Sequence, residues 1–532
     1  MQRLLNPFGP SNADAIAPQS DFNPILDEKT VRFIINSKVS IRDWGKGHFL
    51  CKFRIWQCWR LQTGHPSARA GLKLFNSPRT LKVSLRHHAP PHSKLRMVPH
   101  LVTALTGPIN ELEQRILDSM PAIERWFRLE WMEHTPPFYS SVDIRNAGFK
   151  LAPVDTNLFP GGWNNLTTPM LPLAVQAAMA AIEKICPEAR NLLLIPENHP
   201  RNTFHMSSVA QLRRIFHMAG LNVRVGSIDP DIKQPTTIDL PNGESVTLEP
   251  VIRKKGGGRG RLGVKDFDPC TILLNNDLIA GIPGILEEIH EQYLLPPLHA
   301  GWSVRRKSMH FKSYEEVSKR FGKLLGVDPW LINPMFDKCG EVNFDSGSGV
   351  EDLTSSVDAL LAKIRKKYKE YGINEKPFVV VKADNGSTDG MGIMTVRDVK
   401  DLDAPNRHAK NKNGPINDAH QIHDVIIQEG VLTHERMNDA VAEPVVYMMD
   451  RYVVGGFYRI HAERGVDENL NAPGSRFVPL AFAESTHLPQ PGMKPGASAP
   501  NRFYMYGVIG RLAMVAASYE LEATDPDAEV YS

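Results

Sequence analysis

The segment Pro377–Met394, with the sequence PFVVVKADNGSTDGMGIM, constrains the fold more than any other part of the chain. Four apolar residues of high β propensity end in Lys382, and a loop rich in glycine, serine and threonine follows. A buried strand that delivers a lysine beside backbone N–H donors can hold nucleotide phosphates. The lysine precedes the glycines and the pattern G-x-x-x-x-G-K-[ST] is absent, so this is not a P-loop. A plain strand with a glycine-rich turn is the alternative interpretation.

The length and composition indicate a multidomain globular protein. The 532 residues are too many for one ordinary hydrophobic core, so we expect two or three domains. The hydrophobic share of 42% and the charged share of 23% are typical of soluble proteins, and no apolar run is long enough to span a membrane. Residues 1–25 lack the apolar segment of a secretory signal. The five cysteines form no C-x-x-C pair, which favours reduced thiols and a cytoplasmic location.

Residues 1–96 differ from the rest of the chain in charge. They hold 16 Lys and Arg against 5 Asp and Glu, whereas the remainder holds 46 basic and 54 acidic residues. They show no sustained helical or strand period, and helical spacing begins at Met97. Three interpretations remain open: an extension upstream of a true start at Met97, a basic arm that binds nucleic acid, and an organelle transit peptide. We favour the extension, and therefore expect no nucleic-acid partner.

Residues 97–300 alternate between strands and helices. We predict a strand–helix–strand unit over residues 191–228, with a helix over Ala174–Ile185 before it and a strand over Thr271–Leu274 after it. This alternation is typical of an α/β domain. A formal G-x-G-x-x-G within Arg253–Gly263 follows a basic run rather than a strand, so we reject a dinucleotide-binding fingerprint there.

Residues 301–532 form the second predicted domain, of α/β class with an α+β part towards the C-terminus. Helical periodicity predicts helices over Tyr314–Leu325, Asp352–Tyr371 and Tyr504–Ala517. Beyond the Lys382 strand, further strands are expected over Val425–Val431, Glu443–Asp450, Gly455–Glu463 and Phe477–Phe482.

Polar residues at the ends of these strands suggest chemistry on a nucleotide. Gln428 and Glu429 end a buried strand, just before Val431, and could offer backbone groups and a carboxylate to an adenine and ribose. Arg459 could offset the charge of a transferring phosphoryl group. Carboxylate and amide oxygens are hard ligands suited to Mg²⁺ on nucleotide phosphates. The candidate ligands are Asp450, Asp467, Asn469 and Asn471. Ordinary turn residues and a simple ion pair of Arg459 are the alternatives.

The stretch Asp143–Asn165 is the candidate for substrate binding. Its polar residues alternate with glycine and proline, so we expect an irregular binding loop. Arg145 could bind a substrate carboxylate in a bidentate manner. The other candidates are Lys150, Asp155, Asn157, Asn164 and Asn165. A structural loop held by its own asparagines is the alternative.

The order of these motifs resembles that of the ATP-grasp carboxylate–amine ligases. The similarity is closer to one family, the proteobacterial glutamate–cysteine ligases of the type described from acidithiobacilli. It extends from about Met97 to the C-terminus and does not cover residues 1–96. The stretches that carry it are Val142–Leu166, Leu273–Leu278, Asp328–Pro334, the Lys382 segment, and EPVVYMMDRYVVGGFYRIH from Glu443.

The resemblance implies an enzyme for the first step of glutathione biosynthesis. ATP would phosphorylate the γ-carboxylate of glutamate, and the cysteine amine would then displace phosphate to give γ-glutamylcysteine. Arg459 and Lys382 would act in catalysis, and Asp450, Asp467, Asn469 and Asn471 would hold Mg²⁺. The nucleotide would contact Lys312 or Lys307, Lys382, Ser387, Thr388, Gly390, Gly392, Gln428, Glu429 and Val431. The alternatives are a ligase for another amino-acid pair, or a nucleotide-binding protein with a nucleic-acid arm.

Overall fold

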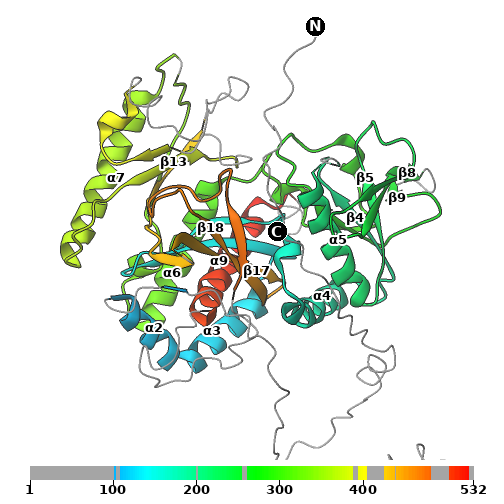
Figure 1. The fold of residues 1–532 in the computed structure, drawn as a ribbon, viewed down its shortest axis with the longest axis horizontal. Helices are drawn as coiled ribbons and strands as arrows, with labels where there is room; N and C mark the ends of the chain where they lie inside the picture. The colour runs from blue at the N-terminus through cyan, green and yellow to red at the C-terminus, as the bar shows by residue number, and fades with distance from the viewer. Residues whose placement is uncertain are drawn as a thin grey trace, which may run out of the picture. The chain divides into compact units, whose positions relative to one another are not determined.

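The computed structural model describes residues 101–102, 108–198, 200, 202–254, 260–344, 346–386, 394–403, 424–437, 439–480 and 503–526. All of them belong to one unit, His92–Ser532, and residues 1–96 lie outside the described part. Helices and sheets are mixed along this part, which confirms the predicted α/β class (Figure 1). In the same ranges, no helix has the length and apolar character needed to cross a membrane.

The central sheet has seven described strands drawn from distant parts of the chain. They are β1 Leu101–Val102, β2 Tyr139–Asn146, β3 Leu151–Asn157, β16 Glu435–Met437, β17 Ala440–Met449, β18 Tyr452–His461 and β19 Arg476–Pro479. One edge of β17 pairs with β18, and its other edge pairs first with β16 and then with β2. The division of the sheets therefore does not follow the predicted boundary at residue 300, because β2 and β3 share a sheet with residues 435–479.

The predicted loop over Asp143–Asn165 is wrong for its first half. β2 and β3 are antiparallel neighbours, with a register shift between Asp143 and Ile144. Many of their polar side chains are buried and meet charged partners from strands about 300 residues away, such as Glu443 for Arg145. The polar residues here therefore belong to strands with buried charged side chains and not to an exposed loop.

A second sheet contains the predicted strand–helix–strand unit. Its order is β11 Tyr293–Leu295, β10 Thr271–Asn275, β4 Asn191–Pro196, β5 Asn222–Ser227, β7 Ser245–Pro250 and β6 Thr236–Asp239. The unit β4–α5–β5 is confirmed, and α5 Thr203–Met218 begins where the Asn202 side chain accepts from the His205 amide. Helix α4 Leu171–Ile185 packs beside α5. The rejected glycine fingerprint begins at Gly258, outside the described residues, and ends at Gly263 in β9 Arg261–Gly263, which pairs antiparallel with β8 Ile252–Lys254. No described helix follows it before β10.

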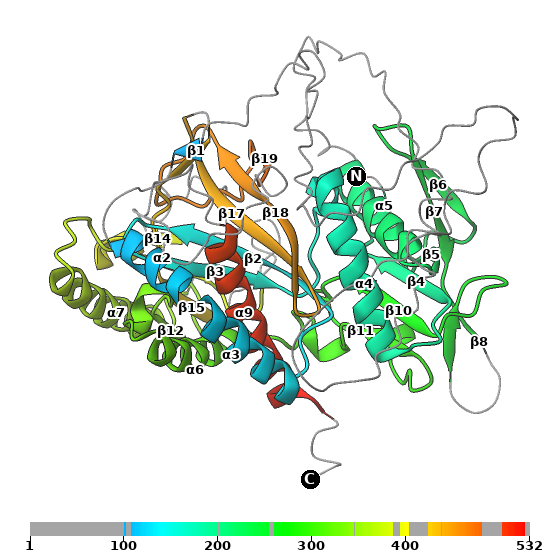
Figure 2. The ribbon, with the colours of Figure 1, turned by 90° about the horizontal axis from the view of Figure 1, so that it is seen from below.

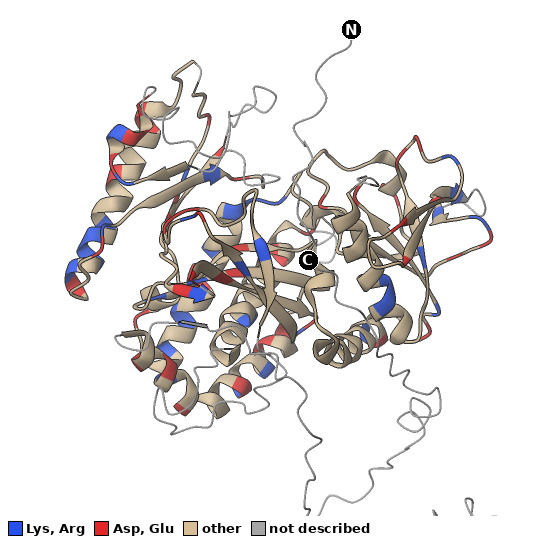
Figure 3. Cartoon of the chain, viewed as in Figure 1, with Lys and Arg blue, Asp and Glu red and all other residues tan. Residues whose placement is uncertain are grey.

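A third, smaller sheet carries the lysine strand. Its antiparallel order is β12 Phe336–Cys339, β15 Val425–Glu429, β13 Val379–Ala383 and β14 Met394–Val396. Helix α7 Val350–Glu370 packs on this sheet, and charged residues of both signs lie along it (Figure 3). It buries the apolar stripe that its helical periodicity predicts, which consists of Val357, Leu360, Leu361, Ile364 and Tyr368. The fold thus holds the lysine strand in a layer distinct from the central sheet.

The remaining helices cover the central sheet. Helix α9 Phe503–Thr524 packs against β17, β2 and β3 on one side and against α6 Lys307–Leu325 on the other (Figure 2). Helices α2 Pro108–Asp118 and α3 Met120–Glu133 precede β2, and α3 packs on α9. Short 3₁₀ turns are η1 Trp163–Asn165, η2 Thr168–Met170, η3 Gly284–Leu286, η4 Leu298–Ala300, η5 Pro329–Leu331 and η7 Val399–Leu402.

Candidate active site

A cavity lies between the central sheet and the smaller sheet. Its empty volume, including the part open to solvent, is about 840 Å³. The lining residues are Asp143, Arg145, Val154, Asp155, Lys307, Val380, Lys382, Ala383, Thr395, Gln428, Glu429, Val431, Glu443, Arg459, Asp467, Asn469 and Asn471. Nine of these are ionisable, so the cavity presents both signs of charge to a ligand.

Strand alternation decides which side chains reach this cavity. In β13, Val379 and Val381 belong to the hydrophobic core, and the opposite face carries Val380 and Lys382 into the lining. In β17 and β18, Glu443 and Arg459 are directly opposite each other and both line the cavity. The two-residue period of the strands thus places Lys382 on one wall of the cavity and the opposed Glu443 and Arg459 on the other.

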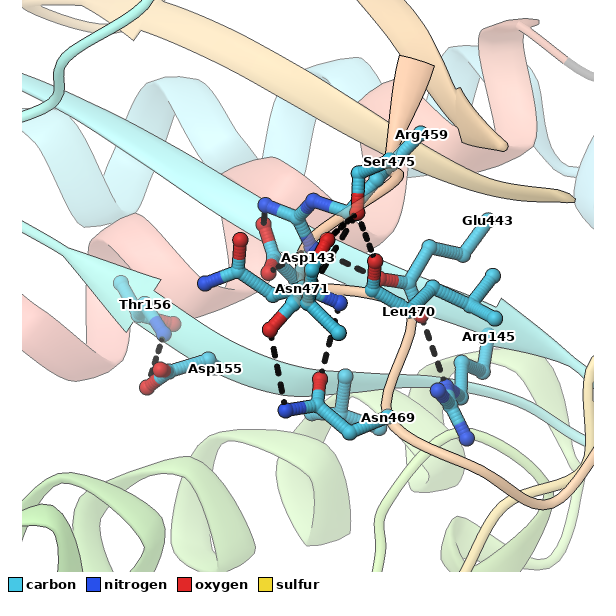
Figure 4. Close-up of polar contacts among 12 residues, drawn as sticks. Asp143, Arg145, Asp155, Thr156, Glu443, Arg459, Asn469, Leu470, Asn471 and Ser475 are labelled. Atoms are coloured by element: carbon cyan, nitrogen blue, oxygen red, sulfur yellow. Dashed lines mark hydrogen bonds and ion pairs between the residues drawn. The ribbon is translucent and has the colours of Figure 1, made fainter. Parts of the chain in front are cut away.

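Four charged side chains of the central sheet form one network at the cavity wall (Figure 4). Nη1 of Arg459 lies 2.7 Å from Asp143 Oδ2 and 2.6 Å from Glu443 Oε1. Nε of Arg145 lies 2.9 Å from Glu443 Oε2. Burial alone would raise the pKa of Glu443, but the two guanidinium groups outweigh it and lower that pKa. Glu443 is therefore the shared counter-ion of both arginines.

Arg145 has protein partners that the sequence did not indicate. Its Nε atom binds Glu443, and its two terminal nitrogens donate to the carbonyl oxygens of Val431, at 3.2 Å, and Glu468, at 2.7 Å. These contacts use three of the five guanidinium N–H donors, and they hold two loops against β17. Arg145 also lines the cavity, so its contact with a substrate carboxylate stays a prediction.

Two lysines from different elements converge on neighbouring residues of β3. Nζ of Lys382 donates to the Val154 carbonyl at 2.7 Å, and Nζ of Lys307 contacts both Asp155 oxygens at 2.7 and 2.9 Å. Burial lowers the pKa of Lys382 to about 8. Burial would raise the pKa of Asp155, but Lys307 and Lys382 outweigh it and lower that pKa. The structure thus brings two lysines together, as expected for the predicted pair of phosphate-binding lysines.

The second lysine of this pair is Lys307 and not Lys312. Both lie on α6, but five residues of an α-helix turn through roughly 140°, so the two side chains point to different sides. Lys307 lines the cavity, whereas Lys312 is exposed and is not among the lining residues. The placement of Lys312 at the nucleotide is therefore wrong.

Gln428 and Glu429, at the end of β15, differ in what they can offer to a nucleotide. Nε2 of Gln428 is buried at the cavity and has no hydrogen-bond acceptor among the described residues. The carboxylate of Glu429, in contrast, binds Nζ of Lys150 at 2.6 Å and the indole nitrogen of Trp330 at 3.0 Å. Nucleotide contacts of Gln428 and Val431 thus stay a prediction, whereas the Glu429 carboxylate is already engaged by protein donors.

The asparagine turn after β18 reaches the cavity as predicted. Asp467, Asn469 and Asn471 are lining residues, and Oδ1 of Asn469 accepts from the Asn471 amide at 2.9 Å (Figure 4). Asp467 forms an ion pair with Arg397, which follows β14 of the smaller sheet. Oxygen ligands for a hard cation therefore lie on the cavity wall.

Asp450 does not join these residues. It lies in the turn between β17 and β18, with a left-handed φ of 49°, and its carboxylate is 3.7 Å from Lys184. The turn is seven residues along β17 from Glu443, which corresponds to roughly 24 Å of extended strand. Asp450 is thus a turn residue, and its assignment as a metal ligand is wrong.

The remaining predicted residues divide into two groups. Asn157 accepts the Phe159 amide at 2.8 Å and Asn164 lies in η1, and neither is among the lining residues. Both act in the turn that follows β3, which favours the structural alternative. Ser387, Thr388, Gly390 and Gly392 lie outside the described residues.

Sequence reasoning missed Asp143 and Glu443 as members of the site. Each lies inside a strand. Alternation from the candidate Arg145, two residues later, was the available signal for Asp143, whereas no site residue two positions away indicated Glu443. A search restricted to strand ends could not find them.

Comparison with known proteins identifies the family to which the chain belongs. A family model described as glutamate-cysteine ligase matches residues 113–521, which includes every lining residue. The chain belongs to the glutamate–cysteine ligase family. As a glutamate–cysteine ligase it is an ATP-dependent enzyme of glutathione biosynthesis that acts on small molecules.

A solved structure supports this membership. The crystal structure at 1.90 Å of a candidate gamma-glutamylcysteine synthetase from Methylobacillus flagellatus KT is 56% identical to this ligase, with a TM-score of 0.73. The similarity covers 81% of this chain and 100% of that chain. A glutathione synthetase-like effector from Globodera pallida, in apoform, is 11% identical over 69% of this chain and 86% of that chain, with a TM-score of 0.33, and supports no conclusion. No curated protein matches the ligase.

Proposed function

We propose that this glutamate–cysteine ligase activates the γ-carboxylate of glutamate by phosphoryl transfer from ATP, in the manner of the ATP-grasp ligases. The observation that carries the proposal is the convergence of Lys382 and Lys307, from two elements, on β3 at the wall of one cavity. The cavity between a small antiparallel sheet and a larger sheet supports the ATP-grasp assignment. The similarity at 56% identity supports γ-glutamylcysteine as the product.

The smaller sheet supplies the nucleotide contacts in this proposal. Gln428 has an unsatisfied amide donor that an adenine ring nitrogen can accept, and Val431 follows on the same segment. Lys382 and Lys307 bind the phosphates as point charges. Because an ammonium has three N–H donors, each lysine can bind a phosphate oxygen while it keeps its contact with β3.

Asp467, Asn469 and Asn471 are the proposed holders of Mg²⁺. Their oxygens suit this ion, which prefers one or two carboxylates together with phosphate oxygens and water. In the described ranges no group of three His, Cys, Asp or Glu side chains is placed to hold a metal, so a protein cage without phosphate does not fit. When bound, Mg²⁺ would neutralise charge that develops on the transferring phosphoryl group.

Arg459 is the proposed contact for the reacting carboxylate and phosphoryl group. Its Nε atom is buried and has no acceptor within the described part of the chain, and the side chain lines the cavity. Asp143 and Glu443 fix the guanidinium in place before any ligand arrives, so no reorganisation is needed during the reaction. The amine of cysteine then attacks the acyl phosphate, a carbon–nitrogen bond forms, and the carbon–oxygen bond to phosphate breaks.

The cytoplasm is the proposed location. Cys186, Cys270 and Cys339, the cysteines within the described ranges, are free thiols, as is usual in a reducing compartment. The family type described from acidithiobacilli is proposed on the stretches quoted above.

The full chain, incubated with Mg-ATP and glutamate, tests the function. ADP release that depends on cysteine, with γ-glutamylcysteine identified by mass, is the expected result. Release of ADP with another amine in place of cysteine would change the substrate assignment. A folded chain that binds ATP and releases no ADP with any amine would refute the proposal.

A further inference from the structure

A buried ion pair joins the two sheets at the wall of the cavity. Lys150 lies in the turn between β2 and β3 of the central sheet, and Glu429 is the last residue of β15 in the smaller sheet. Nζ of Lys150 is 2.6 Å from Oε2 of Glu429, and both side chains are 1% exposed. Glu429 belongs to the cavity wall, but its carboxylate is occupied by protein donors, so we look for its role in how it holds the surrounding chain.

Three donors from two separate segments are fixed around the Glu429 carboxylate. Besides Lys150, the indole nitrogen of Trp330 donates to it at 3.0 Å and the Met335 amide donates at 2.9 Å. The Phe149 ring stacks on Trp330 at 6.0 Å, and the Lys150 ammonium lies 4.2 Å above the Trp330 ring. The tip of the β2–β3 hairpin is thereby attached to the segment that leads into β12.

A buried ion pair is a poor source of stability but defines one geometry. Burial lowers the pKa of Lys150 to about 8, although Glu429 opposes this effect, so the protein maintains the charge at a cost. Well-packed apolar side chains often stabilise a core as much or more. The pair, however, requires one orientation of the end of β15, because the two Glu429 oxygens must accept hydrogen bonds from all three donors.

We propose that Lys150 is a positioning residue for the nucleotide, which through Glu429 fixes the strand end that carries Gln428 and Val431. This rests on the proposed function, in which these two residues contact ATP. Gln428, directly before Glu429, and Val431, two residues after it, both line the cavity. A displaced Glu429 carboxylate would therefore shift the part of the cavity wall that contacts adenine. The phosphate side, at Lys382 and Lys307, has separate contacts with β3 and stays in place.

Steady-state kinetics of two variants of the full chain test this assignment. Lys150→Met removes the ammonium but keeps an unbranched side chain, and Trp330→Phe removes one donor while it keeps a ring against Phe149. We expect the KM for ATP to rise by about tenfold in Lys150→Met, which corresponds to the loss of one charged hydrogen bond. In Trp330→Phe, which loses only part of such an interaction, the KM should rise by about threefold. The kcat at saturating ATP and the KM for glutamate should remain within about twofold.

Lys319→Met is the matched control, because this lysine is exposed on α6 and pairs with Glu315 and Glu316 far from the cavity lining. Its KM for ATP should equal that of the parent. Folded Lys150→Met with an unchanged KM for ATP would overturn the positioning role. If Lys150→Met does not fold, an unchanged KM in Trp330→Phe would do so. An inactive parent chain would instead refute the proposed function itself.

Discussion

Replacement of Lys382 by methionine should make the ligase more stable and less active. Lys382 is 7% exposed, and burial lowers its pKa from 10.5 to about 8. At about 1.4 kcal/mol per pKa unit, a charged ammonium in the folded protein costs about 3 kcal/mol at pH 7. Loss of the hydrogen bond to the Val154 carbonyl offsets about 1 kcal/mol of this, which leaves a gain of about 2 kcal/mol in the free energy of unfolding.

The effect on activity should have the opposite sign. A charged hydrogen bond to phosphate contributes about 1.5–3 kcal/mol, so kcat/KM for ATP should fall roughly 10- to 150-fold in Lys382→Met. Cysteine-dependent ADP release measures the activity, and urea denaturation at pH 7 measures the stability. Lys319→Met serves as the control and should change the free energy of unfolding by less than about 0.5 kcal/mol. A Lys382→Met variant that keeps the parental kcat/KM, or that is destabilised, would refute the reasoning.

Three further predictions concern the charges around the cavity. Glu443→Gln should lower the free energy of unfolding by about 3–5 kcal/mol, because two buried guanidinium groups lose their shared counter-ion; denaturation of parent and variant compares them, and equal stability would contradict this. Lys307→Met should raise the KM for ATP by about tenfold while Lys312→Met leaves it unchanged, and the reverse order would restore Lys312 as the phosphate lysine. The kcat/KM for ATP should fall as the pH rises through about 8, where Lys382 loses its proton in the free enzyme; a profile that is flat to pH 9.5 would count against this lysine.

The stability contribution of Lys382 has a defined pH window. The unfolded chain binds the lysine proton more tightly than the folded one between pH 8 and 10.5. The penalty is therefore complete below pH 8 and disappears as the pH approaches 10.5. Between pH 8 and 10.5, the free energy of unfolding of the parent should therefore rise towards that of Lys382→Met.

Elements with strong periodicity were predictable from the sequence. The unit β4–α5–β5 and the apolar stripe of α7 follow directly from their residue patterns, and both are confirmed. Helix α6 begins at Lys307, seven residues before the predicted start at Tyr314. Its first turns contain the buried Lys307 and His310, whose partners Asp155 and Glu520 lie far away in the sequence, so no local pattern could indicate their burial.

The site was predictable in its elements and less so in the roles of single residues. Lys382, Arg459 and Gln428 reach one cavity because each is carried by a strand of strong β propensity. Asp450 has the same local sequence character as a site residue, but its distance from the cavity depends on how far β17 extends. Arg145 was recognised as important, yet its partners Val431 and Glu468 become visible only in the folded chain.

Transfer of ¹⁸O from the γ-carboxylate of glutamate to inorganic phosphate tests the central claim most directly. The full chain is incubated with Mg-ATP, cysteine and glutamate labelled in the γ-carboxylate, and the phosphate is analysed by mass. Phosphoryl activation predicts one ¹⁸O in each phosphate released, together with γ-glutamylcysteine, because the amine displaces a phosphate that carries one carboxylate oxygen. Unlabelled phosphate in the presence of that product would contradict an acyl phosphate at this site.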